Sequence, residues 1–173
     1  MSELDEAWAQ ALAEAEVRAR VAGRNDLAEY IALRNSNDLL RKTGIDWLLH
    51  TFEELAGKAN RVGSAIQISI VDEHRFRIGS STMVGRLLTL TNGVRTLFVE
   101  AGWPRTPRDG FIRGGGLACA NLRHFGIRAA NRKLFLVKSA SGSPVWKIGE
   151  STTSHLDEAA VSHHLNVLLD IKQ

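Results

Sequence analysis

The sequence has 173 residues, of which 44% are hydrophobic and 24% charged, and its formal net charge is +3. This size suits one domain with a sizeable core, and the composition is ordinary for a globular protein. No apolar run approaches the ~20 residues that span a bilayer, and the acidic N-terminus lacks the apolar stretch of a secretory signal. The sequence therefore predicts a cytoplasmic protein without a membrane partner.

The charge is unevenly divided along the chain. From Lys58 to Gly149 there are 15 Lys and Arg residues against four acidic residues, a net charge of +11, and the remainder carries −8. Such asymmetry between parts of a chain bears on its partners. The single cysteine, Cys119, excludes an intrachain disulfide, and its small apolar neighbours favour a buried thiol over a nucleophile.

The segment 1–60 is predicted to be helical. An Ala- and Glu-rich helix ends at Gly23, a second runs from Asn25 to about Gly44, and a third from Thr43 to Lys58. The third helix has an apolar stripe with i, i+3, i+4, i+7 spacing, which predicts that it covers a sheet. The first helices form an acidic arm, and we expect this arm to mediate assembly into a homo-oligomer.

Short strands are predicted next. Residues 66–71 and 74–78 each alternate apolar and polar side chains, and Asp72-Glu73 is interpreted as a turn between them. Residues 83–101 are predicted to form a hairpin with Asn92 and Gly93 as the central residues of a type I′ turn. Both faces of this hairpin carry apolar residues, which is typical of a sheet that is covered on both sides or curved.

The remaining elements complete an α+β pattern. The glycines at 114–116 predict a bend, residues 133–138 and 145–148 a second hairpin, and Ser154 with Asp157 the cap of a C-terminal helix. We predict an α+β fold with a curved antiparallel sheet of about six or seven short strands, preceded by helices and closed by a C-terminal helix. Residues 61–173 form the basic sheet with its C-terminal helix, in one domain with the helix that precedes them.

No motif predicts catalysis, a metal or a cofactor. The glycines at 114–116 fit neither a P-loop nor a dinucleotide fingerprint, and the histidines near the C-terminus lack the spacing of metal ligands. No nucleophile motif or acid–base carboxylate pair is present. Glu100 is the one acid whose pKa could be perturbed, and a cross-strand ion pair with an arginine accounts for it equally well.

The basic segment predicts a polyanion-binding surface. Its cations are mostly arginine, whose planar fork suits phosphate, and aromatic residues that can stack on bases lie among them. The leading hypothesis is a non-enzymatic binding protein for a polyanion such as nucleic acid, whose site would contain Arg75, Arg77, Arg86, Arg95, Trp103, Arg105, Arg108 and Arg113.

Three alternatives remain open at this point. A curved sheet can enclose an apolar pocket for a small ligand, with arginines at its mouth for an acidic headgroup. The acidic helices of one copy can dock on the basic sheet of another in an assembly. The basic face can also be a solvated surface balanced by the acidic helices.

Overall fold

In the computed structural model, which describes residues 3–150 and 153–171, the chain divides into two units, Met1–Leu40 and Arg41–Gln173. The first unit contains α1 (Glu3–Val21) and the start of α2 (Asn25–Arg61), joined by a turn in which Gly23 has a φ of 73°. The buried apolar residues described in this unit are Ala19, Ala28 and Ile31. Two of these three are alanines, whose small side chains each contribute little apolar area on burial.

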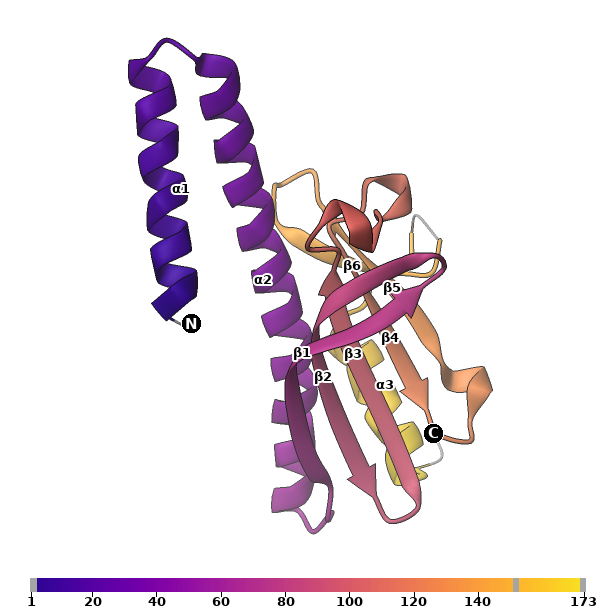
Figure 1. Cartoon of the computed structure of the whole chain (residues 1–173). Helices are drawn as coiled ribbons and strands as arrows, with labels where there is room; N and C mark the ends of the chain where they lie inside the picture. The colour runs from indigo at the N-terminus through magenta and orange to yellow at the C-terminus, as the bar shows by residue number, and fades with distance from the viewer. Residues whose placement is uncertain (1–2, 151–152, 172–173) are drawn as a thin grey trace. The chain divides into compact units, whose positions relative to one another are not determined.

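The second unit is built on one antiparallel sheet whose strands follow each other in chain order (Figure 1). The strands are β1 (Gln67–Ile78), β2 (Ser81–Asn92), β3 (Arg95–Trp103), β4 (Ala118–His124), β5 (Arg132–Lys138) and β6 (Pro144–Ile148). The helix α3 (Glu158–Leu169) follows them, and three short 3-10 helices, η1 (Pro107–Asp109), η2 (Arg113–Gly115) and η3 (Arg128–Ala130), lie in the loops. The predicted α+β fold with a curved antiparallel sheet and a C-terminal helix is confirmed.

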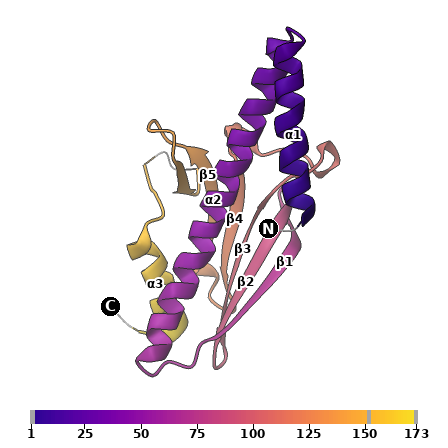
Figure 2. The same ribbon diagram turned by 90° about the vertical axis from the view of Figure 1, so that its left-hand side faces the viewer.

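The core of the second unit lies between one face of the sheet and two helices. Within this unit, α3 and the C-terminal part of α2 lie on the same side of the sheet (Figure 2). Register places fully buried side chains on that face from four neighbouring strands, and they are Leu88, Leu90, Leu97, Val99, Leu122 and Leu134. None of the helices in the described ranges has the length and hydrophobicity that a bilayer span requires.

The predicted break between a second and a third helix is wrong, because α2 continues without interruption through Gly44. A Cβ at Gly44 would lie 2.6 Å from Cδ1 of Leu136, so this residue is a point of close approach between helix and sheet. The carbonyl of Gly44 also accepts a hydrogen bond of 2.8 Å from Nε1 of Trp146. The lack of a side chain at Gly44 therefore allows α2 to pack closely on the sheet. The sequence pattern could not distinguish such a glycine from one that ends a helix.

Two predicted turns also differ from the structure. Asp72-Glu73 is not a turn but a bulge within β1, where the register shifts between Val71 and His74 and Glu73 has a φ of 55°. In the β2–β3 hairpin the pair that closes the loop is Asn92 and Arg95, so the central residues are Gly93 and Val94. Only the first of these has positive φ, as a type II′ turn requires.

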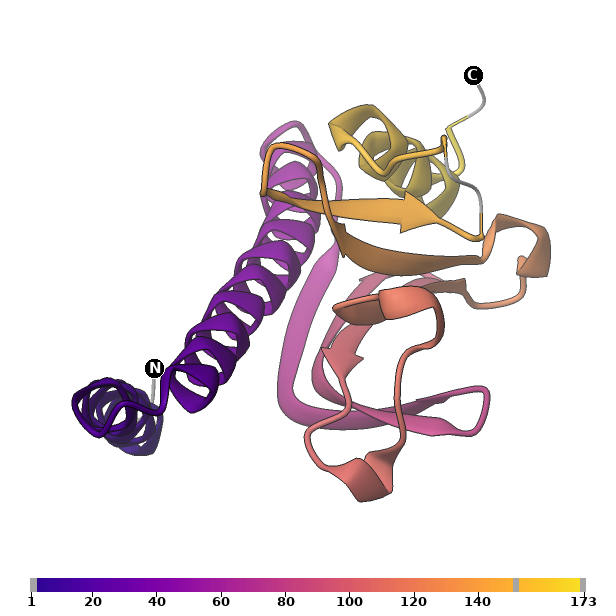
Figure 3. The same cartoon turned by 90° about the horizontal axis from the view of Figure 1, so that it is seen from above.

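A crease crosses the sheet next to the bulge. His74 lies opposite Gly85, and Gly85 lies opposite Gly102 on β3. A Cβ on Gly85 would lie 1.9 Å from the carbonyl oxygen of Ala101, and one on Gly102 would lie 2.6 Å from the carbonyl carbon of Val84. Bulges and strand glycines both allow sharp bending, and Figure 3 shows the resulting curl of the strands.

The helix α3 is held on the sheet by two contacts. Arg95 donates to the carbonyl of Val167 at 2.8 Å and pairs with Asp170 at 2.9 Å, so a cation stabilises the C-terminal end of the helix. His124 and His164 form a buried hydrogen bond of 2.9 Å between Nε2 and Nδ1. The helix begins after Asp157, whose side chain accepts from the amide of Ala160, and therefore three residues later than the predicted cap at Ser154.

Two glycines of α2 give a test of the packing at Gly44. Gly44→Ala is expected to lower the free energy of unfolding by about 1–3 kcal/mol, because the new methyl group overlaps a fully buried leucine. Gly57→Ala, whose Cβ meets nothing closer than 3.8 Å, is expected to raise it by up to about 1 kcal/mol through helix propensity. Urea unfolding of both variants decides this, and equal effects would contradict the assigned role of Gly44.

The histidine pair predicts acid sensitivity. Burial is the main cause that lowers the pKa of both His124 and His164 from 6.5 to about 4. Smaller electrostatic contributions come from His163 and Arg132 at both histidines, from Arg95 at His124 and from His124 at His164. In the unfolded chain these two histidines take up protons near pH 6.5, whereas in the folded chain they do so only near pH 4. Stability is therefore expected to fall as the pH drops through this window, by about 2 kcal/mol for each histidine between pH 7 and 5.

Two variants distinguish the effect of the His124–His164 pair from that of other groups that titrate in acid. Replacing both partners together, His124→Leu with His164→Leu, removes the proton uptake without leaving an unpaired polar group. The pH dependence of urea unfolding should become shallower in this variant and stay unchanged in His155→Gln, which alters an exposed side chain. If the free energy of unfolding depended on pH in the double variant as it does in the wild type, the two histidines would have ordinary pKa values in the folded protein.

Candidate functional site

The concave face of the sheet, opposite the helices, carries a second and smaller apolar cluster. Phe76, Met83 and Cys119 are buried there, and Ile78, Ile112 and Phe135 pack against them. The expected buried thiol is confirmed, since Cys119 is 1% exposed. Burial raises its pKa to about 12, so the thiol stays protonated at neutral pH and is a poor nucleophile.

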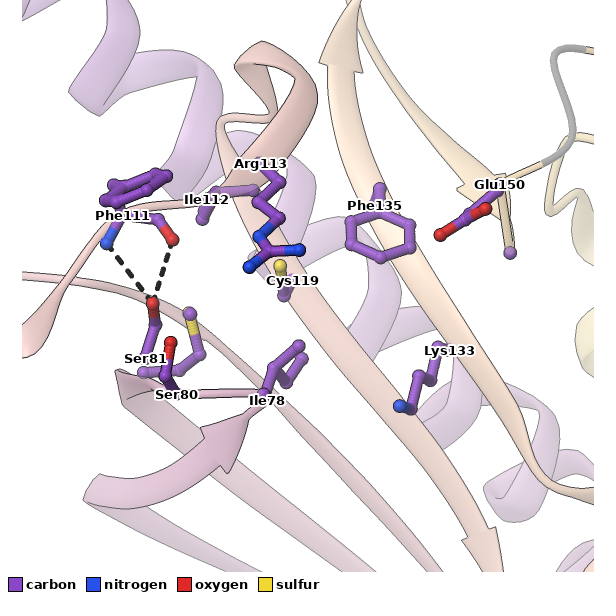
Figure 4. A pocket seen from close by; sticks show the side chains of 13 residues that line it. Ile78, Ser80, Ser81, Phe111, Ile112, Arg113, Cys119, Lys133, Phe135 and Glu150 are labelled. Atoms are coloured by element: carbon purple, nitrogen blue, oxygen red, sulfur yellow. Dashed lines mark hydrogen bonds between the residues drawn. The ribbon is translucent and has the colours of Figure 1, made fainter.

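A pocket of about 380 Å³ opens over this cluster. Its walls come from the tip of the β1–β2 hairpin, the segment after η1, the strands β4 and β5, and the end of β6 (Figure 4). The hydroxyl of Ser81 donates to the carbonyl of Phe111 at 2.9 Å and accepts from its amide at 3.2 Å. These two hydrogen bonds hold the hairpin tip against the opposite wall.

Three charged side chains line the pocket beside its apolar floor. Arg113 is the first residue of η2, Lys133 lies on β5, and Glu150 follows β6 (Figure 4). All three residues are exposed. Within the described ranges neither Arg113 nor Lys133 forms an ion pair with an acidic group of the protein. The lining thus combines an apolar floor with two cations and one carboxylate.

A polar network lies next to the pocket on the same face. The carboxylate of Glu100 is 5% exposed and accepts from Asn121 Nδ2 at 3.0 Å, and it pairs with Arg123 at 3.3 Å and His74 at 2.8 Å. Asn121 lies opposite Lys133 in the sheet, so the network adjoins the pocket lining. His74 reaches Glu100 across β2 at Gly85, which has no side chain to block it. The ion pair with an arginine that we considered for Glu100 is present.

Two of the predicted polyanion residues lie on the opposite face. Arg86 pairs with Asp72 at 2.8 Å and with Asp46 of α2 at 3.4 Å, and Arg95 is bound to the end of α3. Both arginines face the helices and have acidic partners there. Register places Arg75, Arg77 and Trp103 on this same face of the sheet. Arg86 and Arg95 differ from them because they pair with acidic groups that belong to α2 and to the end of α3.

Four other predicted residues come together at the loop after β3. The guanidinium of Arg105 lies 3.5 Å from the centre of the Trp103 ring, and Arg75 pairs with Asp109 at 2.8 Å. Burial alone would raise the pKa of Asp109, but hydrogen bonds from Thr106 and the amide of Arg105 lower it on balance. Arg108 is exposed in the same loop, whereas Arg77 only donates to the carbonyl of Ser80 at 3.4 Å and Arg113 belongs to the pocket.

Metal ligands do not gather in the part of the chain that the structure describes, where no three His, Cys, Asp or Glu side chains are placed to hold an ion. A hollow of about 430 Å³ along α1, at Ala13, Glu14, Val17 and Arg18, is lined by described residues of that helix alone. It offers no converging polar groups from several elements. The concave pocket is therefore the better candidate site.

Sequence reasoning missed most of the pocket. Lys133, Phe135 and Cys119 share the concave face because Phe135 lies opposite Cys119 and two residues from Lys133. Alternation along each strand would have placed them on one face, but only if the pairing of β4 with β5 had been known. Glu150 and Ile112 lie outside the strands, and no local pattern indicates their position.

Comparison of the chain with protein-family models, curated proteins and solved structures finds no match. Its function is therefore inferred from the geometry of the site.

Proposed function

We propose that the protein binds a small amphiphilic anion in the concave pocket, with the apolar body on the floor and the acidic head between Arg113 and Lys133. The observation that carries this proposal is the contrast among the cations of the concave face. Arg123 is neutralised by the buried Glu100, whereas the two cations that line the pocket have no such acidic partner among the described residues.

The dimensions and chemistry of the pocket support this function. Its volume of about 380 Å³ lies within the ~300–1,000 Å³ typical of small-molecule sites. An apolar body would cover the half-buried Ile78, Ile112 and Phe135, which contributes roughly 25 cal/mol per Å² of area removed from water. A carboxylate or phosphate head would accept charge-assisted hydrogen bonds from the two cations. The carboxylate of Glu150 favours ligands that also carry a hydrogen-bond donor.

The charge preference can be measured with ligands of one chain length. Decanoate is expected to bind more tightly than decanol, and decyltrimethylammonium least tightly, in isothermal titration calorimetry. Arg113→Met and Lys133→Met should each weaken decanoate binding roughly tenfold, because each removes one charge-assisted contact. Arg128→Met, which removes an exposed arginine of η3 outside the pocket, is the matched control and should leave the affinity unchanged.

Two results would contradict the proposal. One is equal affinity for the anionic and cationic ligands, which would mean that the pocket cations do not face the headgroup. The other is the absence of decanoate binding to a protein that is folded by circular dichroism.

A second candidate function is polyanion binding at the loop after β3. The observation in its favour is that Arg75, Trp103, Arg105 and Arg108 lie together there, with Arg41 of α2 at 5.8 Å from the Trp103 ring. The planar guanidinium group of arginine suits phosphate recognition and also stacks on aromatic rings. Assembly through the acidic helices, by contrast, stays a prediction that no feature of the described structure favours over the others.

The polyanion function predicts salt-dependent binding to a single-stranded oligonucleotide. The double variant Arg105→Glu with Arg108→Glu should weaken binding and reduce the slope of log affinity against log salt by about 1.4, since each lost phosphate contact contributes about 0.7. Fluorescence anisotropy measures this, and Arg128→Glu is the control for one charge reversal outside the loop. Affinity that does not change between low and moderate salt would rule this function out.

A further inference from the structure

The outer edge of β1 is open over a short stretch. β1 is the first strand of the sheet, and no strand of the described ranges pairs with its outer side (Figure 2). The other edge strand, β6, is bridged to His155 by Lys147. Residues 67–71 carry no charge, and Ile68 and Val71 are 41% and 48% exposed. Proteins usually protect such an edge with charges, prolines or bulges.

Hairpin register shows which backbone groups of this stretch face outward. Ile78 and Ser81 close the β1–β2 hairpin, and Asn92 and Arg95 close the β2–β3 hairpin. Since hydrogen-bonded and non-hydrogen-bonded pairs alternate in antiparallel sheets, Gln67, Ser69 and Val71 direct their amides and carbonyls toward β2. The backbone groups of Ile68 and Ile70 then point away from the sheet.

The structure closes this edge on both sides of Ile68 and Ile70. On one side, the side chain of Asn60 accepts from the amide of Ile66 at 2.8 Å and donates to its carbonyl at 2.9 Å. On the other side, the bulge at Asp72-Glu73 ends regular pairing. In the described ranges, no hydrogen bond outside the sheet involves the backbone of Ile68 or Ile70. Four backbone groups are thus left open between two protected positions.

We propose that this edge pairs with the same edge of a second copy of the chain, antiparallel and about a two-fold axis at Ser69. Ile68 of each copy then lies opposite Ile70 of the other, and the two pairs form four backbone hydrogen bonds. The two isoleucines lie on the helix-covered face, where cross-strand apolar pairs stabilise a sheet. No like charges meet, because residues 67–71 are neutral.

A second copy fits this edge better than an unrelated strand because the edge is self-complementary. The two outward-facing residues are both isoleucines, and the residue between them, at the axis, is a small serine. Extension beyond them is blocked symmetrically, since the clamped Ile66 of one copy would meet the bulge of the other. The resulting dimer has one sheet that is continuous through both copies.

The oligomeric state of the full chain tests this proposal. Sedimentation equilibrium should give twice the 19.0 kDa chain mass for the wild type at micromolar concentration. Ile68→Lys places a charge at the edge, and Ile70→Pro removes an outward amide without disturbing the β1–β2 hydrogen bonds. Both should shift the mass to that of the monomer. Val94→Lys, at a 91% exposed residue of the β2–β3 turn, should remain dimeric.

Hydrogen exchange gives a readout that does not depend on the variants folding. The amides of Ile68 and Ile70 should exchange slowly in concentrated wild-type protein and at least about tenfold faster after dilution below the dimer dissociation constant. A wild-type monomer at 100 µM would overturn the proposal. A dimer that persists in both edge variants, or edge amides whose exchange does not depend on concentration, would also overturn it.

Discussion

The crease across β1, β2 and β3 is the constraint on which the rest of the second unit depends. It combines the bulge at Asp72-Glu73 with two facing glycines, Gly85 and Gly102, whose backbones leave no space for a side chain. Without it the β1–β2 hairpin would continue as a flat ribbon, and its tip could not form a wall of the pocket. Because Gly85 has no side chain, His74 can also reach Glu100 across β2.

The sheet is strongly basic because the segment from Lys58 to Gly149 contains few acidic residues. Among the four acids between Lys58 and Gly149, Asp72, Glu100 and Asp109 each pair with an arginine. Arg86 also pairs with Asp46 of α2, Glu100 belongs to the polar network, and Asp109 binds Arg75 at the loop after β3. Arg113 and Lys133 line the pocket and have no acidic partner among the described residues. High net charge alone would not have distinguished them from the structural arginines.

Local sequence signals predicted elements better than they predicted the connections between them. The apolar stripe from Ile45 to Ala56 identified a sheet-covering helix. The predicted hairpin at 83–101 is present, although its turn is centred on Gly93 and Val94. Gly44 and Asp72-Glu73 misled us for one reason. Glycine and acidic pairs occur at turns, but they are equally suited to close packing and to bulges, and only the neighbouring elements decide which applies.

The sequence by itself determined the α+β class, the basic sheet and the buried thiol, because periodicity, composition and small neighbours are local properties. Only the tertiary structure decided which of these cations have acidic partners and which line the pocket. Arg86 and Arg113 look alike in the sequence, yet one is paired with aspartates under a helix and the other lines a pocket. That difference depends on strand register and on the crease, both of which bring together residues far apart in the chain. The hairpin at 83–101 thus organises the sheet, and its curvature creates the site.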